Sequence, residues 1–263
     1  MGMKMKRGLM GWLLAVSLTI AGACGSSDGS EGKAVITVSA AASLTGALNE
    51  LKPAFESANP DVTLLFNFGS SGALQQQIEQ GAPVDLYISA AASHMNTLIE
   101  KGLVQQGQTV SLLSNALVVV TPKDGREQLE GLEELLLSQV SKVAIGIPDS
   151  VPAGAYAKEA LTQAGLWDKL QGKTVQAKDV KQVLQYVETG NVDAGFVYKT
   201  DALASGGAAI AFEVDPSSYS PIQYPAGIVR DSDDFEETRK LYEFLQSDEA
   251  MGVFRQYGFS ESK

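Results

Sequence analysis

Several turns of this sequence combine small residues, hydroxyl groups and predicted helix starts with almost no charge. They follow Val38, Phe68, Ile147, Gln176 and Val197, and they include Ser43, the pair Ser70 and Ser71, Ala153 with Gly154, and Asp179 with Val180. A serine hydroxyl can donate a hydrogen bond, and a helix N-terminus presents unpaired backbone N–H groups and a partial positive charge. If these turns meet in one cleft, they can bind an anion.

Each of these residues also has an ordinary structural explanation. A serine directly before a helix usually caps that helix by accepting a hydrogen bond from its backbone. The spacing of the turns does not show whether they converge, so the residues by themselves leave both explanations open.

The composition disfavours other chemistries. One cysteine and one histidine among 263 residues are too few for an internal disulfide or a zinc site of the usual kind. A hydrolase is disfavoured on two grounds. Its base would have to be the single histidine, His94, and the serines of Gly69–Gly72 do not lie in a G-x-S-x-G nucleophile turn. We interpret His94 as a surface residue and Trp167 as a packing residue. The formal charge of −11 disfavours binding to nucleic-acid phosphates.

The elements that must position these turns alternate between strands and helices. Strands are predicted at 35–38, 62–68, 85–89, 116–121, 143–147, 174–176, 193–198 and 222–229, and helices at 44–58, 74–80, 95–101, 129–136, 154–161, 179–189 and 235–245. Repeated strand–turn–helix units indicate an α/β protein with a largely parallel sheet, either as one sheet or as two lobes with a cleft. In such sheets ligands bind beyond the carboxyl ends of the strands.

The first 23 residues have the pattern of a signal peptide. A basic start at residues 4–7 precedes an apolar run at 9–23 that is too short to span a membrane. The run ends in IAGAC, which resembles a bacterial lipobox, although Ala21 stands where leucine is commonest. The resemblance implies that Cys24 is lipidated and becomes the mature N-terminus. Plain secretory cleavage near Ala23 and an uncleaved anchor are the alternatives.

Longer motifs occur in order along the chain. They are Ala40–Thr45 (AAASLT), Phe68–Gly72 (FGSSG), Gln77–Ala90 (QIEQGAPVDLYISA), Asn115–Val120 (NALVVV), Val151–Leu161 (VPAGAYAKEAL), Val197–Ala202 (VYKTDA) and Gln256–Phe259 (QYGF). Together they resemble the ModA-type molybdate-binding proteins of ABC uptake systems, over essentially all of residues 34–259.

The resemblance implies a type II periplasmic-binding-protein fold of the α/β class, with two lobes, a mixed sheet flanked by helices in each, and a ligand cleft between them. It implies capture of molybdate, and also of tungstate, for delivery to a membrane ABC permease. We expect a monomer outside the cytoplasm, held to the membrane by the lipid on Cys24, with no enzymatic activity, cofactor, bare metal ion or nucleic-acid partner.

The resemblance also implies which residues contact the ligand. They are Ser43 and Ser71 through their hydroxyls, Ala153 and Val180 through backbone N–H groups, and Tyr198 through its phenol O–H. Tyr198 could instead be a buried aromatic residue of the core.

One position departs from the family pattern. The family often has a third small hydroxyl residue where this chain has Gly72. This departure leaves open whether Ser70 or Ser71 faces the ligand.

A site made only of donors suits this ligand class. Molybdate and tungstate carry no proton at neutral pH, so their oxygens only accept hydrogen bonds. Hydrogen phosphate carries a proton that needs an acceptor, and a site without a carboxylate discriminates against it. The alternatives are a tungstate-selective protein, or a sulfate, thiosulfate or other small-anion protein on the same scaffold. A hydrolase and the sensing domain of a regulator find less support.

We expect the chain to divide as follows: a signal peptide at 1–23, the lipidated cysteine and a flexible tether at 24–33, lobe I at 34–115 plus 223–263, and lobe II at 116–222. The crossing strands 116–121 and 222–229 would form a hinge that lets the lobes close on the anion.

Overall fold

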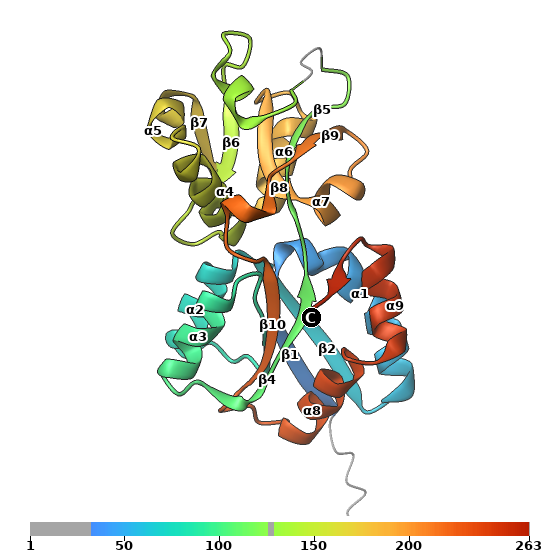
Figure 1. The fold of residues 1–263 in the computed structure, drawn as a ribbon. Helices are drawn as coiled ribbons and strands as arrows, with labels where there is room; N and C mark the ends of the chain where they lie inside the picture. Colours follow the sequence, from blue (N-terminus) through green and yellow to red (C-terminus); the bar gives the residue numbers. More distant parts are fainter. Residues whose placement is uncertain (1–32, 126–128, 263) are drawn as a thin grey trace, which may run out of the picture. The chain divides into compact units, whose positions relative to one another are not determined.

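The computed structural model describes residues 33–125 and 129–262. The predicted signal peptide, Cys24 and nearly all of the tether lie outside the described residues. Figure 1 shows the described chain as two sheets, each with helices packed beside it. The mixed α/β architecture with two lobes, expected from the resemblance, is confirmed.

The first sheet has the strand order β11-β4-β10-β3-β1-β2. Its strands are β1 (Ala34–Ala41), β2 (Val62–Gly69), β3 (Leu86–Ile88), β4 (Val104–Ser114), β10 (Gln223–Val229) and β11 (Ser260–Glu261). β1 runs parallel to β2 and β3, whereas β10 runs antiparallel to β3 and β4. The accompanying helices are α1 (Thr45–Ala58), α2 (Ser71–Glu79), α3 (Ala92–Glu100), α8 (Phe235–Phe244) and α9 (Asp248–Gln256), with the 3-10 helix η1 (Ala42–Leu44).

The second sheet has the order β7-β6-β8-β5-β9. Its strands are β5 (Leu117–Pro122), β6 (Val143–Gly146), β7 (Thr174–Ala177), β8 (Ala194–Tyr198) and β9 (Ala208–Glu213). β6 is parallel to β7 and β8, and β5 is antiparallel to β8 and β9. Around it lie α4 (Pro152–Gln163), α5 (Trp167–Leu170), α6 (Val180–Glu188) and α7 (Lys199–Leu203), with η2 (Leu132–Leu136), η3 (Gln171–Lys173) and η4 (Pro216–Ser218).

The chain passes between the two sheets twice. β4 ends at Ser114 and β5 begins at Leu117, so Asn115 and Ala116 make the first crossing, which Figure 1 shows as an almost continuous ribbon. The return lies between the end of β9 at Glu213 and the start of β10. Among the described strands, β10 pairs with β3 and β4, both in the first sheet.

Several elements differ from the sequence prediction: the strands β4, β9 and β11 and the helices α5, α7 and α9 were not predicted, and one predicted helix has another geometry. β4 carries polar residues and a glycine at positions 105–108 and is held by antiparallel pairing with β10, more than a hundred residues later, so its own residues do not indicate a strand. The helix predicted at 129–136 is a 3-10 helix over Leu132–Leu136. Leucines at 129, 132 and 135 recur every three residues, a spacing that suits a 3-10 helix as well as one face of an α-helix.

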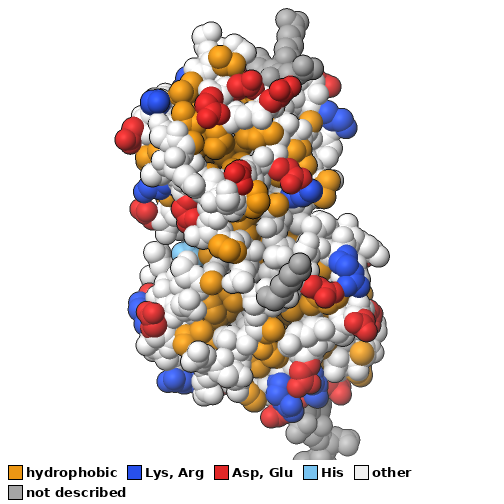
Figure 2. All heavy atoms as spheres, in the orientation of Figure 1, with side chains coloured by type: hydrophobic (Ala, Val, Ile, Leu, Met, Phe, Trp, Pro, Cys, Tyr) orange, Lys and Arg blue, Asp and Glu red, His pale blue; other side chains and the backbone are white. Residues whose placement is uncertain are grey.

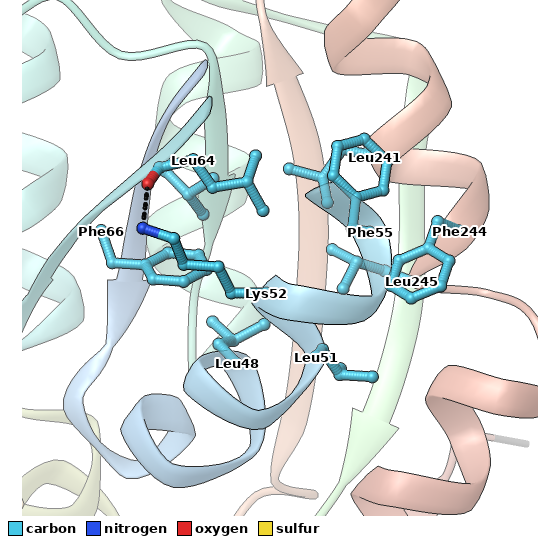
Figure 3. A pocket seen from close by; sticks show the side chains of 10 residues that line it. Leu48, Leu51, Lys52, Phe55, Leu64, Phe66, Leu241, Phe244 and Leu245 are labelled. Atoms are coloured by element: carbon cyan, nitrogen blue, oxygen red, sulfur yellow. Dashed lines mark hydrogen bonds between the residues drawn. The ribbon is translucent and has the colours of Figure 1, made fainter. Parts of the chain in front are cut away.

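Side chains of α1 cover one edge of the first sheet. β2 lies at one edge of the sheet and β11 at the other. The backbone of Leu64 in β2 bonds to α1: its N–H donates to Glu56 Oε1 (2.8 Å) and its carbonyl accepts from Lys52 Nζ (2.7 Å), as Figure 3 shows for Lys52. Beside this contact, Phe55 packs at 5.4 Å between ring centroids against Phe244 of α8. Pairing an edge strand in this way protects it from association with other chains.

A close backbone contact positions the start of α4. A Cβ added to Gly154 would lie 2.0 Å from the carbonyl oxygen of Gly146 at the end of β6. Only glycine allows this approach, because the neighbouring atoms belong to backbone and cannot turn away.

Gly154→Ala is therefore expected to destabilise the protein by about 1–3 kcal/mol. Gly252→Ala is the matched control: Gly252 lies within α9 with nothing within 4 Å of an added Cβ, so alanine there is expected to stabilise by up to about 1 kcal/mol. Urea denaturation of both variants measures the difference. Equal stability of the Gly154→Ala variant and the unchanged protein would contradict this view of α4.

Candidate functional site

A small cavity lies where the carboxyl ends of parallel strands from the two sheets meet. From the first sheet its walls are Ala41, Ala42, Ser43, Gly69, Ser70, Ser71 and Ala90, and from the second they are Val151, Pro152, Val180 and Tyr198. Within the described part of the chain, the lining contains no charged residue. The cavity has a volume of about 10 Å³. This is about the space that one water molecule needs, roughly 10–15 Å³, so a larger ligand requires the walls to move apart.

The structure brings together most of the residues predicted to form a site. Ser43, Ser70, Ser71, Val180 and Tyr198 all line the cavity. Ala153 does not line it, but it is fully buried in the first turn of α4, directly after the lining residue Pro152. Because proline has no N–H, Ala153 carries the first backbone donor of this helix.

The remaining lining residues were not singled out by the sequence. They are small or apolar and carry no functional group in their side chains: Ala41, Ala42, Gly69, Ala90, Val151 and Pro152. Their positions beside the predicted serines and helix starts were the signal that could have identified them.

The contacts of Ser71 leave its hydroxyl proton without an acceptor in the described part of the chain. The N–H of Ala90 donates to Ser71 Oγ (2.9 Å), and Tyr87 Oη donates to the Ser71 carbonyl (2.8 Å). Ser71 is fully buried. Because Oγ already accepts from a backbone donor, the hydroxyl can donate its own proton to a ligand.

The ordinary capping role does not account for the serines of the cavity. Ser70 is the N-cap residue of α2, but its side chain makes no capping hydrogen bond, and the N-cap of α1 is Leu44 rather than Ser43. By contrast, Asp179 caps α6 by accepting from the N–H of Gln182 (2.8 Å). That cap leaves the N–H of Val180, the first residue of α6, without an acceptor inside the helix.

Tyr198 carries a buried hydroxyl without a partner. Its side chain is 2 % exposed, and Oη accepts or donates no hydrogen bond among the described residues. Its ring packs edge-on against Tyr224, with 5.8 Å between centroids. Burial, together with Tyr224, raises the pKa of Tyr198 well above its ordinary value, so the phenol stays protonated. An unpaired buried hydroxyl is costly, and a ligand that accepts its proton removes the cost.

One charged pair lies close behind the cavity without lining it. Lys181 Nζ is 2.8 Å from Oδ1 of Asp201, but the geometry is that of an ion pair without hydrogen-bond angles, and within the described chain neither oxygen of Asp201 has a hydrogen-bond partner. Burial raises the pKa of Asp201, and Lys181 opposes that shift. The pair joins α6, which carries Val180, to α7, which follows Tyr198 directly.

Several contacts hold the two sides of the cavity together. The N–H of Gly72 donates to the Ser150 carbonyl (2.9 Å), and Tyr156 Oη donates to the Ala90 carbonyl (3.3 Å). A Cβ on residue 72 would lie 2.7 Å from Ser150 Cα, which explains why this chain has glycine at that position.

His94 is partly exposed, in keeping with the surface position that the sequence suggested, and it is the pale blue side chain of Figure 2. It is half-buried beside Gly72, and its Nδ1 lies 2.6 Å from Gln75 Oε1. Burial lowers its pKa. His94 does not line the cavity, so no role as a base in a reaction there is supported.

Charge is spread over the surface instead of the cavity. Figure 2 shows acidic and basic side chains scattered over both halves of the face that it draws. In residues 33–125 and 129–262, no three His, Cys, Asp or Glu side chains gather as a metal site. None of the helices in these two ranges has the length and hydropathy of a membrane span.

These features define a solute-binding protein with a cavity of neutral donors between two α/β lobes. The family model of bacterial extracellular solute-binding proteins matches residues 36–260, and the chain belongs to this family.

Three named proteins are similar to this chain over most of its length. The molybdate-binding protein ModA of Escherichia coli is 36 % identical over 250 residues, which cover 94 % of this chain and 95 % of that protein. YvgL of Bacillus subtilis, named as a candidate ABC transporter substrate-binding lipoprotein, is 49 % identical over 235 residues, covering 89 % and 90 %. The periplasmic molybdate-binding protein of Azotobacter vinelandii shares the fold, with a TM-score of 0.78 at 23 % identity, covering 87 % of this chain and 100 % of that one.

Tyr198→Phe tests whether the unpaired hydroxyl serves the fold. Because Oη has no partner among the described residues, its removal is expected to leave the stability of the ligand-free protein unchanged or raise it. The control is Tyr87→Phe, which removes the bond to the Ser71 carbonyl and is expected to cost about 1–2 kcal/mol. Thermal and urea unfolding measure both. A clear loss of stability in Tyr198→Phe would show a structural role.

Proposed function

We propose that this protein captures molybdate outside the cytoplasm and delivers it to a membrane ABC permease. The observation that carries the proposal is the buried hydroxyl of Tyr198, which has no partner among the described residues and borders a cavity lined by serines and helix starts. The identity of 36 % with a molybdate-binding protein, over nearly the whole length of both chains, supports the choice of anion.

The chemistry of the cavity fits a fully deprotonated oxyanion. Ser43, Ser71 and Tyr198 would donate through hydroxyls, and Ala153 and Val180 through backbone N–H groups, with Ser70 as a further donor. Each charge-assisted bond contributes roughly 1.5–3 kcal/mol. Together they can offset dehydration of the dianion and leave micromolar or tighter affinity, about −8 kcal/mol or better. Because the described lining holds no carboxylate, the proton of hydrogen phosphate would find only hydroxyl oxygens there, which are weaker acceptors than a carboxylate.

The wider functional context forms part of the same proposal. Tungstate has the charge and shape of molybdate and would bind as well. The protein would act as a monomeric binding protein and not as an enzyme, held to the outer face of the membrane by lipid on Cys24. The named lipoprotein relative at 49 % identity supports the anchor.

Opening and closing of the lobes would admit the anion. We place lobe I at 34–115 plus 223–263 and lobe II at 116–222, with the hinge at the two crossings. Walls of the cavity come from both sheets, so separation of the lobes would open the site to solvent.

Isothermal titration calorimetry and thermal shift on residues 25–263 test the ligand. Molybdate at about 100 times its Kd is expected to stabilise the protein by roughly 2.7 kcal/mol. Tungstate is expected to act similarly and sulfate weakly. A clear response to sulfate without one to molybdate would exclude the proposal.

A pair of single substitutions tests which serine faces the anion. Ser71→Ala is expected to weaken molybdate binding more than Ser70→Ala, because Ser71 Oγ already accepts from Ala90 and has its proton free. Ser71→Ala also leaves the Ala90 N–H unpaired, at a cost of about 1–2 kcal/mol in stability, so titrations must be made well below the unfolding temperature. If Ser70→Ala alone weakens binding, the assignment is reversed; if neither does, the ligand binds elsewhere.

A further inference from the structure

A chain of hydrogen bonds reaches the cavity from the crossing between the sheets. Tyr224 Oη lies 3.0 Å from Ser43 Oγ and 3.2 Å from Asn115 Nδ2. Asn115 occupies the first crossing, and Tyr224 lies on β10 of the first sheet. Ser43 and Tyr224 are 181 residues apart in sequence, so this contact exists only in the folded protein.

The direction of these hydrogen bonds is fixed at the end farthest from the cavity, at Ala116. The backbone N–H of Ala116 can only donate, and its acceptor is Asn115 Oδ1 (2.9 Å). The amide NH₂ of Asn115 must therefore point the other way, where it donates to Tyr224 Oη and to Thr200 Oγ1 (2.9 Å). Reversing the amide would place two donors against each other.

The next two bonds follow from this direction. Since Tyr224 Oη accepts from Asn115, its own proton is left to donate, and Ser43 Oγ is the acceptor found for it in the described chain. The opposite arrangement, with Ser43 as the donor, would leave the proton of the fully buried Tyr224 unpaired. Burial raises the pKa of Tyr224 well above its ordinary value, so that proton is retained.

We propose that Tyr224 is a positioning residue that commits the hydroxyl of Ser43 to donate into the cavity. The proposal rests on the proposed function, because it assumes that Ser43 contacts the bound oxyanion. An oxygen that accepts from Tyr224 has its own proton free for the ligand. We call the hydrogen bonds from Asn115 through Tyr224 to Ser43 the relay. The relay makes Ser43 a donor before the anion arrives and selects against ligands that carry a proton.

A double-mutant cycle in the otherwise unchanged protein tests the relay. Tyr224→Phe is expected to weaken molybdate binding about three- to tenfold, and Ser43→Ala about tenfold or more. Because Tyr224 acts through Ser43, the double variant is expected to match Ser43→Ala alone. Additive losses, or no loss in Tyr224→Phe, would overturn the relay. No loss in Ser43→Ala would instead remove Ser43 from the site and so count against the proposed function.

Tyr219→Phe is the matched control. Tyr219 is also nearly buried and also holds the chain near the crossing, where it accepts from the N–H of Leu117 (3.1 Å), but it does not line the cavity. Its loss is expected to leave molybdate affinity unchanged. A loss equal to that of Tyr224→Phe would indicate a general effect on packing and contradict the relay.

Competition with phosphate separates positioning from packing. Without Tyr224 Oη, the hydroxyl of Ser43 can turn and accept the proton of hydrogen phosphate. Tyr224→Phe is therefore expected to lose affinity for sulfate in parallel with molybdate, while phosphate competes relatively better. Equal competition by phosphate in Tyr224→Phe and in the unchanged protein would contradict the relay.

Asn115→Asp is a second test of the relay, which can be used if Tyr224→Phe does not fold. Aspartate keeps an acceptor for the N–H of Ala116, but its second oxygen accepts a hydrogen bond from Tyr224 Oη. Ser43 must then donate to Tyr224, so that its lone pairs face the anion. Binding is expected to fall at least as far as in Ser43→Ala. Adding Ser43→Ala to this variant is expected to cause no further loss, and a further loss would overturn the direction that we assign.

Discussion

The cavity depends on one constraint: the parallel strands of both sheets must end at the same place. β1 and β2 end beside Ser43 and Ser70, and β8 ends at Tyr198. At those ends the chain turns into helices, whose first N–H groups have no acceptor inside the helix. The two crossings of the chain bring the ends together, and direct contacts such as Gly72 to Ser150 hold them there.

Neutral donors would allow a chain with a formal charge of −11 to bind an anion. Most of the charges lie on the surface, where water and salt screen them, and the buried Asp201 is paired with Lys181. The described lining of the cavity contains hydroxyls and small residues. A lysine or arginine in the cavity would attract many anions alike. Fixed neutral donors instead reward a ligand whose oxygens all accept, and they penalise one that brings a proton.

Much of the fold could be predicted from local patterns. The strands that became β1, β2, β6 and β8 are short apolar runs, and the helices that follow them show apolar residues at helical spacing. β4 escaped prediction because its pairing with β10, and not its own residues, makes it a strand. The distinction between an α-helix and a 3-10 helix at Leu132–Leu136 was also beyond the pattern, since leucines spaced by three suit both.

The sequence by itself determined the class of site: hydroxyls, glycines and helix starts at the ends of strands, in motifs long enough to indicate the family. Tertiary structure decided which of these groups have free protons. It placed Ser71 under the N–H of Ala90, left the hydroxyl of Tyr198 without a partner among the described residues, and set Tyr224 beside Ser43. These outcomes depend on pairs of atoms from distant parts of the chain. A sequence lists the donors, but only packing shows which of them already have an acceptor.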